Sequence, residues 1–262
     1  MNKLFKVPPV IGIEGFEYHG CHSYSEYNYL QNTYLSCIKR RHFEIALNLT
    51  SKYFYKANVI DFGCGDGIFL PSLSKYFCSV LGIEKNKIFC SIAQKLVEEL
   101  DLKNVKVISN DDLTIQEIKK KLIGEETYEI VFLLEVMEHI GTTFHTMYED
   151  KITFLKDIFS LMNNKGIIVI SVPKMVGLSF LVQHLALTLL SKNRSDYTLK
   201  ELIECSFFKN TSNVEKYWVP DFTHKGFNHE KFERCMGNYF EIKRKTADAF
   251  QVLYVIGEKR DD

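Results

Sequence analysis

Apolar and polar positions along the chain fall into two alternating kinds of segment from residue 57 onward. Apolar runs at residues 58–62, 79–84, 105–108, 128–134 and 167–172 are typical of strands buried on both faces of a parallel sheet. Between them, apolar residues recur at helical spacing, which predicts helices at 68–76, 87–100, 115–123 and 148–162. Strands separated by helices predict an α/β fold with helices on both faces of a parallel sheet.

Residues 173–225 interrupt this alternation and predict an insert at about 174–226. Its apolar run at 176–190 is shorter than the roughly 20 residues that cross a bilayer, so we expect a buried or interfacial helix. A second helix is expected at 199–208. The regular pattern then resumes with a helix at 230–237 and strands at 240–246 and 250–258. The turn at 247–249 would make these two strands an antiparallel hairpin.

Charge and cysteine content narrow the classes of function. The 33 basic and 33 acidic residues cancel, which removes the global electrostatic reason to expect nucleic-acid binding. The seven cysteines are odd in number and none is in CxxC spacing, so neither a disulfide framework nor a zinc knuckle is indicated. Residues 1–9 hold no apolar core of a signal peptide. We therefore expect a reduced, cytoplasmic protein, and its oligomeric state is not predicted.

Three glycines follow the first predicted strand at alternate positions. Gly63, Gly65 and Gly67 leave the backbone uncovered at the carboxyl end of that strand, where open α/β sheets bind ligands. The spacing differs from the GxGxxG pattern of dinucleotide enzymes, because the third glycine comes one residue early. The glycines alone predict only that a ligand approaches the main chain closely.

Acidic residues at the ends of three successive strands indicate the charge and the chemical groups of that ligand. Asp61 and Asp66 flank the first glycines and would favour a positively charged ligand over a pyrophosphate. Glu84 closes the second strand, where a carboxylate accepts hydrogen bonds from ribose hydroxyls. Asp111 and its neighbours follow the third strand and are placed to meet an adenine amino group. The set predicts a nucleoside that carries positive charge.

With these residues the chain resembles class I S-adenosylmethionine-dependent methyltransferases. The resemblance covers roughly residues 55 to 175 and rests on segments 59–70, 80–84, 109–113, 128–140 and 166–173. It implies a Rossmann-like three-layer sandwich with a seven-stranded, mostly parallel sheet whose last strand is antiparallel. It also implies a cofactor site that consists of Asp61, Gly63, Cys64, Gly65, Glu84, Lys85, Asp111, Asp112, Leu113 and Glu135. In it, Asp61 and the glycine backbone would hold the methionine end, Glu84 the ribose, and Asp111 with Leu113 the adenine.

A second group of polar residues, Glu135-x-x-Glu138-His139, follows the fourth strand. We assign Glu138 and His139 as catalytic candidates. The string is similar to that of two kinds of methyltransferase: those of quinone biosynthesis, and small-RNA 2′-O-methyltransferases in which the two glutamates, the histidine and a later histidine hold a divalent metal. Here the later histidine would be His224 or His229, with His145 a candidate of worse spacing. No metal ligand is assigned, and a divalent metal stays an alternative.

The insert is expected to recognise the methyl acceptor. Its apolar run, with Tyr217 and Trp218, suggests an apolar or ring-bearing small molecule, presented in one interpretation at a membrane surface by peripheral contact. The first interpretation is a methyltransferase that acts on the oxygen of such a molecule. A metal-dependent RNA 2′-O-methyltransferase is the alternative, and the neutral net charge disfavours it. A catalytically silent cofactor-binding scaffold is a third reading, against which the intact glycines and acids argue.

The N-terminal residues 1–56 differ from the rest of the chain. Pro8-Pro9 and several glycines suggest an extended arm, and helical spacing between residues 24 and 55 predicts one or two helices. Tyrosines are frequent here, at positions 18, 24, 27, 29 and 34. They suggest either aromatic helix packing or a lid over the cofactor site. We divide the chain accordingly into a lid, residues 1–56, and a methyltransferase domain, residues 57–262.

Overall fold

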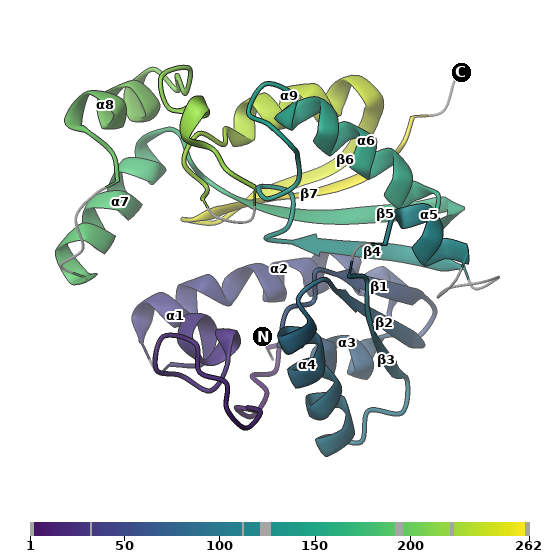
Figure 1. The fold of residues 1–262 in the computed structure, drawn as a ribbon. Helices are drawn as coiled ribbons and strands as arrows, with labels where there is room; N and C mark the ends of the chain where they lie inside the picture. Colours follow the sequence, from purple (N-terminus) through teal and green to yellow (C-terminus); the bar gives the residue numbers. More distant parts are fainter. Residues whose placement is uncertain are drawn as a thin grey trace. The chain divides into compact units, whose positions relative to one another are not determined.

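The computed structural model describes residues 3–31, 33–111, 113–120, 127–191, 196–220 and 223–259. Its seven-stranded sheet has the order β3-β2-β1-β4-β5-β7-β6 (Figure 1). The strands are β1 (Asn58–Phe62), β2 (Ser79–Glu84), β3 (Val105–Ser109), β4 (Tyr128–Leu134), β5 (Met162–Pro173), β6 (Phe240–Ala247) and β7 (Gln251–Glu258). The predicted α/β fold and its terminal antiparallel hairpin are confirmed. The chain divides into two compact units, Met1–Leu134 with Asp157–Ile170 and Glu135–Lys156 with Ser171–Asp262.

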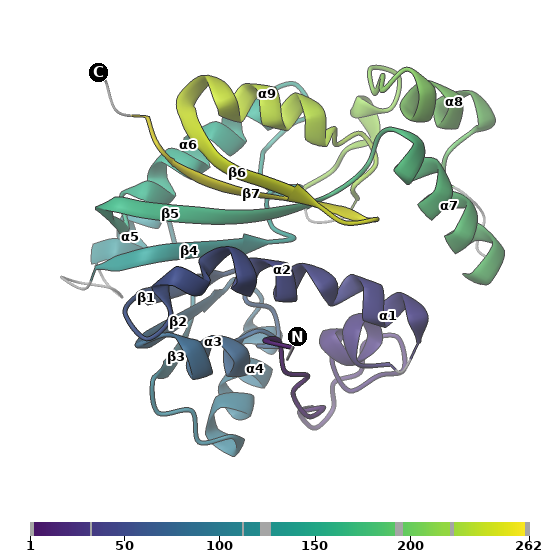
Figure 2. The same cartoon turned by 180° about the vertical axis from the view of Figure 1, so that it is seen from behind.

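Parallel pairing organises the first unit. β1 pairs with β2 on one side and β4 on the other, and β2 pairs with β3, so that Val59 lies opposite both Val80 and Ile130. Helices α2 (Arg41–Thr50), α3 (Leu70–Tyr76) and α4 (Lys87–Glu99) lie together on one side of these strands (Figures 1 and 2). Strands β1, β2 and β4 are buried almost throughout, as a sheet covered by helices requires, whereas in the edge strand β3 only Val107 is buried.

The local sequence explains where helix α4 begins, but it does not predict which of the apolar residues of the helix are buried. The side chain of Asn86 accepts hydrogen bonds from the backbone N–H groups of Ile88 and Phe89, which satisfies two donors of the first turn. Ile88, Ile92 and Leu96 recur at helical spacing, but Ile92 and Leu96 are buried whereas Ile88, in the first turn, is 42% exposed.

The N-terminal arm is tied to α2 and α3 within the same unit. The backbone N–H groups of Leu4 and Phe5 donate to the Glu44 carboxylate at 3.0 and 2.7 Å. The Phe5 ring stacks on Phe43, Phe43 on Phe69, and Phe69 meets Phe132 of β4 edge-on. After the arm come a π-helical turn (Glu26–Leu30) and α1 (Tyr34–Lys39), ahead of α2. Two α-helices thus occupy the region where one or two were predicted.

Strand β5 begins earlier than predicted. Helix α6 (Met147–Phe159) ends in a turn at Ser160 and Leu161, and residues 163–166, expected to end the helix, already lie in β5. The amide of Asn163 donates to Glu129 of β4 at 3.0 Å. This contact between distant parts of the sequence outweighs the turn preference of the Asn-Asn-Lys-Gly string. Helix α5 is described over Ile115–Ile118, and the predicted positions 121–123 lie outside the described residues.

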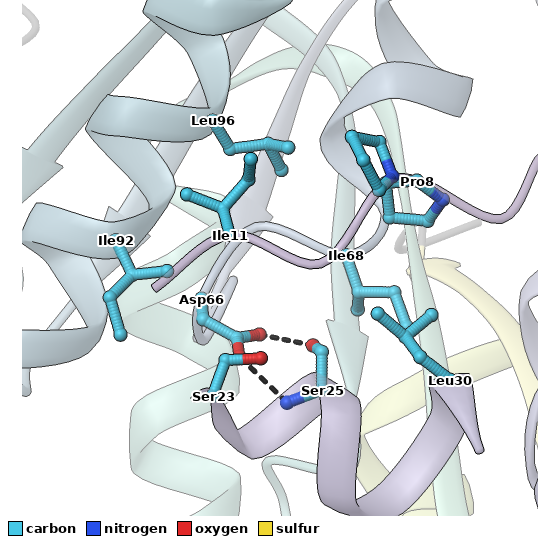
Figure 3. Close-up of a pocket in the computed structure, with 10 residues that line it drawn as sticks. Pro8, Ile11, Ser23, Ser25, Leu30, Asp66, Ile68, Ile92 and Leu96 are labelled. Atoms are coloured by element: carbon cyan, nitrogen blue, oxygen red, sulfur yellow. Dashed lines mark hydrogen bonds between the residues drawn. The ribbon is translucent and has the colours of Figure 1, made fainter. Parts of the chain in front are cut away.

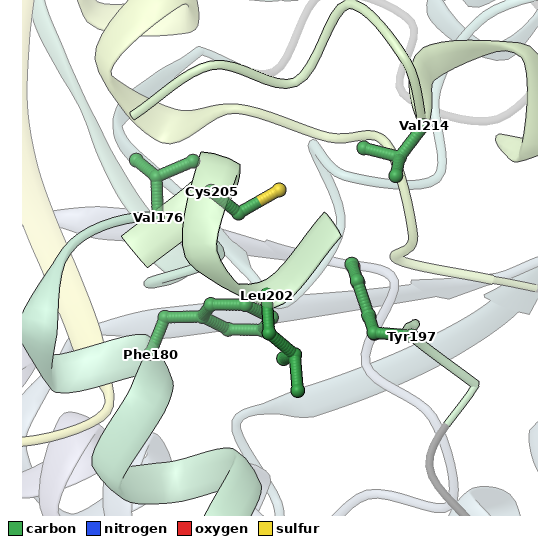
Figure 4. Packing of buried hydrophobic residues seen from close by; sticks show 6 residues of the cluster. All are labelled: Val176, Phe180, Tyr197, Leu202, Cys205 and Val214. Carbon is green, nitrogen blue, oxygen red and sulfur yellow. The ribbon is translucent and has the colours of Figure 1, made fainter. Parts of the chain in front are cut away.

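The second unit contains most of α6, the insert, helix α9 (His229–Tyr239) and the β6–β7 hairpin. The insert has helices α7 (Leu178–Ser191) and α8 (Leu199–Phe207), the latter begun by a capping box between Thr198 and Glu201. They are joined by a cluster of buried residues shown in Figure 4: Val176, Phe180, Tyr197, Leu202, Cys205 and Val214. Among the described residues, none of the helices has the length and apolar character to cross a membrane.

Candidate functional site

The glycine loop follows β1 in the first unit. Gly65 has a φ of +57° with open space where a side chain would be, so its backbone is accessible to a ligand. Gly67, with a φ of +90°, lies against α4, where an added Cβ would be 3.1 Å from the Cβ of Ala93. One glycine therefore keeps the loop open, and the other allows the loop to pack closely on the helix.

Two buried carboxylates, Asp61 and Glu84, belong to the strands next to this loop. Glu84 accepts hydrogen bonds from the backbone N–H groups of Gly65 at 2.8 Å and Asn86 at 2.7 Å, which fixes the loop to the end of β2. Asp61 is buried, and burial together with the nearby Glu84 raises its pKa to about 7. Burial also raises the pKa of Glu84. A cationic ligand would favour the ionised form of both groups and is in turn favoured by them.

The remaining predicted cofactor residues lie at the ends of neighbouring strands. The register places Glu84 opposite Ser109, so the residues after β3 emerge at the same edge of the sheet as the glycine loop. There Asp111 pairs with Lys87 at 2.5 Å, and Leu113 N–H donates to Asn110 O at 3.0 Å. Cys64 is buried under the loop, and Lys85 is exposed. Asp112 lies outside the described residues, and Glu135 begins the second unit.

Asp66, the other acid of the loop, has a role that the sequence did not indicate. Its carboxylate accepts hydrogen bonds from the backbone N–H of Ser25 at 2.6 Å and from the Ser25 hydroxyl (Figure 3). Asp66 is therefore engaged by the N-terminal segment, whereas we had expected it to act with Asp61 on the ligand. A cavity of about 10 Å³, room for about one water, lies beside this contact.

A tight turn carries the second predicted group of residues. Glu135, directly after β4, has a φ of +59°, and its N–H donates to both the carbonyl and the hydroxyl of Ser171 at 3.2 and 3.1 Å. His139 N–H donates to Val136 O at 3.0 Å. A non-glycine residue with positive φ is uncommon and is often found at functional sites.

Glu138, His139 and His224 meet in the second unit. Their ligand atoms all lie within 4.8 Å of one another. The Nε2 atom of His224 is 3.1 Å from Nε2 of His139 and 4.0 Å from Oε1 of Glu138. Glu138 is fully buried, and neither of its carboxylate oxygens has a hydrogen-bond partner within the described part of the chain. A buried, unsatisfied carboxylate beside two imidazoles is a donor set that fits a divalent cation.

The pKa of Glu138 is also consistent with a site for a divalent cation. Burial raises the pKa of Glu138 well above its ordinary value, and the charge of Glu135 adds to the effect. Glu135 thus lies near Glu138, although it is outside the three-residue cluster. His229 is outside it too: it is the first residue of α9, and burial lowers its pKa to about 4. Of the two later histidines proposed from sequence, the structure brings His224 to the cluster.

Trp218 is a correction to the sequence interpretation. We expected it near the methyl acceptor, but it is only 3% exposed, and its indole Nε1–H donates to the carbonyl of Glu138 at 2.9 Å. Tyr217 beside it is 46% exposed. The two adjacent aromatic residues therefore have different environments, and sequence alone gave no means to tell them apart.

Comparisons with known proteins agree with the geometry of the glycine loop. A family model described as a methyltransferase domain matches residues 34–235. The ubiquinone biosynthesis O-methyltransferase of Acinetobacter baylyi is 26% identical over 53% of this chain and 55% of its own length. The protein of the same description from Acinetobacter baumannii strain ACICU is 29% identical over 31% of this chain. The chain spans about half the length of the first relative and about a third of the second.

Solved structures with the same fold have low sequence identity. The PH0226 protein of Pyrococcus horikoshii matches with a TM-score of 0.57 at 16% identity, covering 89% of this chain and 96% of its own. Magnesium protoporphyrin IX methyltransferase of Synechocystis, solved with bound SAH, gives 0.53 at 16% identity over 87% and 89% of the two chains. The methyltransferase domain of bacterial CtHen1 gives 0.51 at 14% identity over 84% and 99%. These likenesses concern the fold.

Replacing Asp61 should change the pH dependence of stability. Its pKa of about 7 in the folded chain exceeds the ordinary 3.8, so between these values the folded state binds more protons than the unfolded state. Stability contributed by the protonated carboxyl is therefore lost as pH rises toward 7. Asp61→Asn should remove a slope of up to about 1.4 kcal/mol per pH unit. Urea unfolding of the ligand-free protein at about pH 5 and pH 7.5 measures this slope.

The control is Asp101→Asn, which changes an exposed carboxylate. If the unfolding free energy depends on pH equally in the unaltered protein, Asp61→Asn and Asp101→Asn, the raised pKa of Asp61 is contradicted.

Proposed function

The chain belongs to the methyltransferase-domain family of S-adenosylmethionine-dependent enzymes, and from this premise we propose that it methylates a hydroxyl oxygen of a small, apolar or ring-bearing molecule. The observation that carries the proposal is the convergence of Glu138, His139 and His224. That donor set suits activation of a hydroxyl, which must lose a proton on methylation. Similarity to relatives described as O-methyltransferases of ubiquinone biosynthesis supports oxygen as the accepting atom.

The glycine loop is proposed to bind the cofactor through residues of the first unit. Asp61 and the exposed backbone at Gly65 would hold the methionine end, and Glu84 the ribose. The cofactor carries a sulfonium and an ammonium, so its arrival compensates the unfavourable burial of Asp61 and Glu84. Asp111, whose present partner Lys87 is exposed at the first turn of α4, would turn to the adenine amino group.

In the proposed reaction the acceptor oxygen attacks the sulfonium methyl in line with the sulfur. The new carbon–oxygen bond forms as the carbon–sulfur bond breaks, S-adenosylhomocysteine leaves as a neutral sulfide, and the hydroxyl proton is released. Charge is neutralised along this path, so orientation of the two reactants and exclusion of water are the main tasks of the protein.

The cluster would prepare the acceptor. A bound divalent cation lowers the pKa of a hydroxyl that it coordinates. Glu138, His139 and His224 would hold that cation, and Glu138 is suited to it because a bound cation favours the ionised form of this buried carboxyl. The side chain of His224 is 38% exposed and that of His139 is partly exposed, so solvent reaches both histidines of the cluster.

A metal-dependent methyltransferase of RNA ribose 2′-hydroxyls is the second candidate. The presence of His224 in the cluster favours it, because this alternative requires a later histidine beside Glu138 and His139. Phosphate contacts dominate RNA affinity, however, and the chain has 33 basic and 33 acidic residues. Exposed apolar residues of the insert, Leu178, Val182, Leu199 and Phe208, also suit an apolar acceptor better than a nucleic acid.

The N-terminal residues 1–56 are proposed to act as a lid. Asp66 lies between two glycines of the cofactor loop, and its carboxylate is held by Ser25. The same segment is anchored through the Phe5 ring to Phe69, with 6.4 Å between the ring centroids, and through Lys6 N–H to Ser72. Movement of the N-terminal segment would therefore be coupled directly to the loop on which the cofactor is proposed to lie.

A methyl-transfer screen tests the acceptor class. With labelled S-adenosylmethionine and a divalent cation, we expect transfer to catechols, phenols or quinols that carry an apolar substituent, and none to short single-stranded or duplex RNA. Methylated products are identified by mass spectrometry. Transfer to RNA 2′-hydroxyls in preference to every small molecule would replace the proposal by its alternative.

Removal of His224 tests the metal. His224→Ala should lower Mn²⁺ affinity at least tenfold and kcat by a hundredfold or more, because one of three ligands is lost, while S-adenosylhomocysteine affinity stays unchanged. Calorimetry and initial rates measure these quantities. His145→Ala, at an exposed histidine of the same unit, is the matched control. Full activity of His224→Ala in the presence of EDTA would eliminate the metal.

Loss of the Ser25 hydroxyl tests the lid. Ser25→Ala removes one of the hydrogen bonds to Asp66, and we expect S-adenosylhomocysteine to dissociate several-fold faster in stopped-flow experiments, since one hydrogen bond to a charged group is worth about 1.5 kcal/mol or more. Ser51→Ala, which removes an exposed hydroxyl of the same unit, should leave the rate unchanged. Equal dissociation rates in Ser25→Ala and the unaltered protein would argue against a lid.

A further inference from the structure

Lys151 of helix α6 is fully buried in the second unit. Its ammonium donates a hydrogen bond to the carbonyl of Ile140 and lies 4.7 Å from the ring centroid of Trp218 and 5.5 Å from that of Phe227. The charged groups that act on it are Glu138 and Asp150. Burying a lysine costs several kcal/mol in the absence of compensating contacts. The carbonyl and the two rings supply such contacts.

Trp218 binds the same loop from a segment 80 residues further along the chain. Its indole N–H donates to the carbonyl of Glu138 at 2.9 Å. The two carbonyls held in this way, those of Glu138 and Ile140, lie on either side of His139. Two contacts thus hold the backbone around Glu138 and His139. One comes from the indole of Trp218, and the other from the ammonium of Lys151, which packs on the Trp218 ring.

Gly141 completes this contact. Its φ is +139°, and a Cβ added there would be 2.9 Å from Cη2 of Trp218. The indole ring therefore lies directly against the loop backbone, at a position that only glycine allows without a shift. Ring, ammonium and loop form one packed arrangement.

We propose that Trp218, with Lys151 packed on its ring, is a positioning residue that directs Glu138 and His139 toward His224. This inference rests on the proposed metal-assisted function. Trp218 would touch neither substrate nor cation. It would set the direction of two ligand side chains by holding the main chain between them, and groups that orient ligands in this way commonly change metal affinity by 10- to 100-fold.

A role in packing alone would need only the ring, whereas the positioning role needs the indole N–H. Trp218→Phe keeps an aromatic ring for Lys151 but has no donor for the Glu138 carbonyl, and it also lacks the Cη2 atom that meets Gly141. Benzothienylalanine at position 218 keeps the bicyclic ring and removes the donor alone. Trp218 is also the single tryptophan of the chain. Its fluorescence therefore reports this position without interference, and we expect it to change when Mn²⁺ binds to the unaltered protein.

The decisive experiment is calorimetric titration of the full chain with Mn²⁺. We expect Trp218→Phe to bind Mn²⁺ about tenfold more weakly, with unchanged S-adenosylhomocysteine affinity and a lower kcat at saturating acceptor. The control is Tyr254→Phe, which also loses one hydrogen bond of a buried aromatic residue in this unit, at 3.0 Å to Glu233. It should bind Mn²⁺ like the unaltered protein.

The outcomes distinguish this inference from the function on which it rests. Equal Mn²⁺ affinity in Trp218→Phe and the unaltered protein would overturn the positioning role and leave the metal site intact. No binding of Mn²⁺ by the unaltered protein would overturn both. If Trp218→Phe does not fold, benzothienylalanine at position 218, which keeps the bicyclic shape and lacks the N–H, gives the same comparison.

Discussion

Burial of carboxylates is the constraint on which both proposed sites depend: burial raises the pKa of Glu138 although the charge of Lys151 acts in the opposite direction. Asp61 under the glycine loop and Glu138 in the second unit are buried, and burial raises the pKa of each. A folded chain retains such groups against their desolvation penalty when something else stabilises them. We propose that this partner is the positively charged cofactor for Asp61 and a divalent cation for Glu138.

Glu84 and the loop that carries Glu138 are held in place mainly by hydrogen bonds that involve backbone groups. Glu84 is held by the N–H groups of Gly65 and Asn86, and its position follows from the pairing of β2 with β3. The Glu138 loop is fixed by its carbonyl contacts with Trp218 and Lys151. The Glu138 carboxylate stays available for a ligand because the main chain of its loop makes these contacts, whereas the Glu84 carboxylate itself accepts the two hydrogen bonds.

Residue type alone does not reveal which aromatic and apolar residues pack in the interior and which are exposed. Phe5, Phe43 and Phe69 tie the N-terminal arm to the sheet. Trp218, which the sequence interpretation associated with the acceptor, donates instead to the Glu138 carbonyl. Apolar residues of the insert, such as Leu178 and Val182, are exposed while Phe180 between them joins the insert core. Acceptor recognition is therefore expected from the exposed positions of α7 and α8.

The amino-acid sequence by itself determined the alternation of strands and helices, the glycine loop with Asp61 and Glu84, and hence the methyltransferase family. These features depend on spacing within one element or between an element and the loop that follows it. Only the tertiary structure decided that His224 rather than His229 meets His139, that Asp66 binds Ser25, and that Trp218 holds the Glu138 loop. Those contacts join residues 85, 41 and 80 positions apart. Local periodicity carries no information about such distant partners, because the packing of the whole chain selects them.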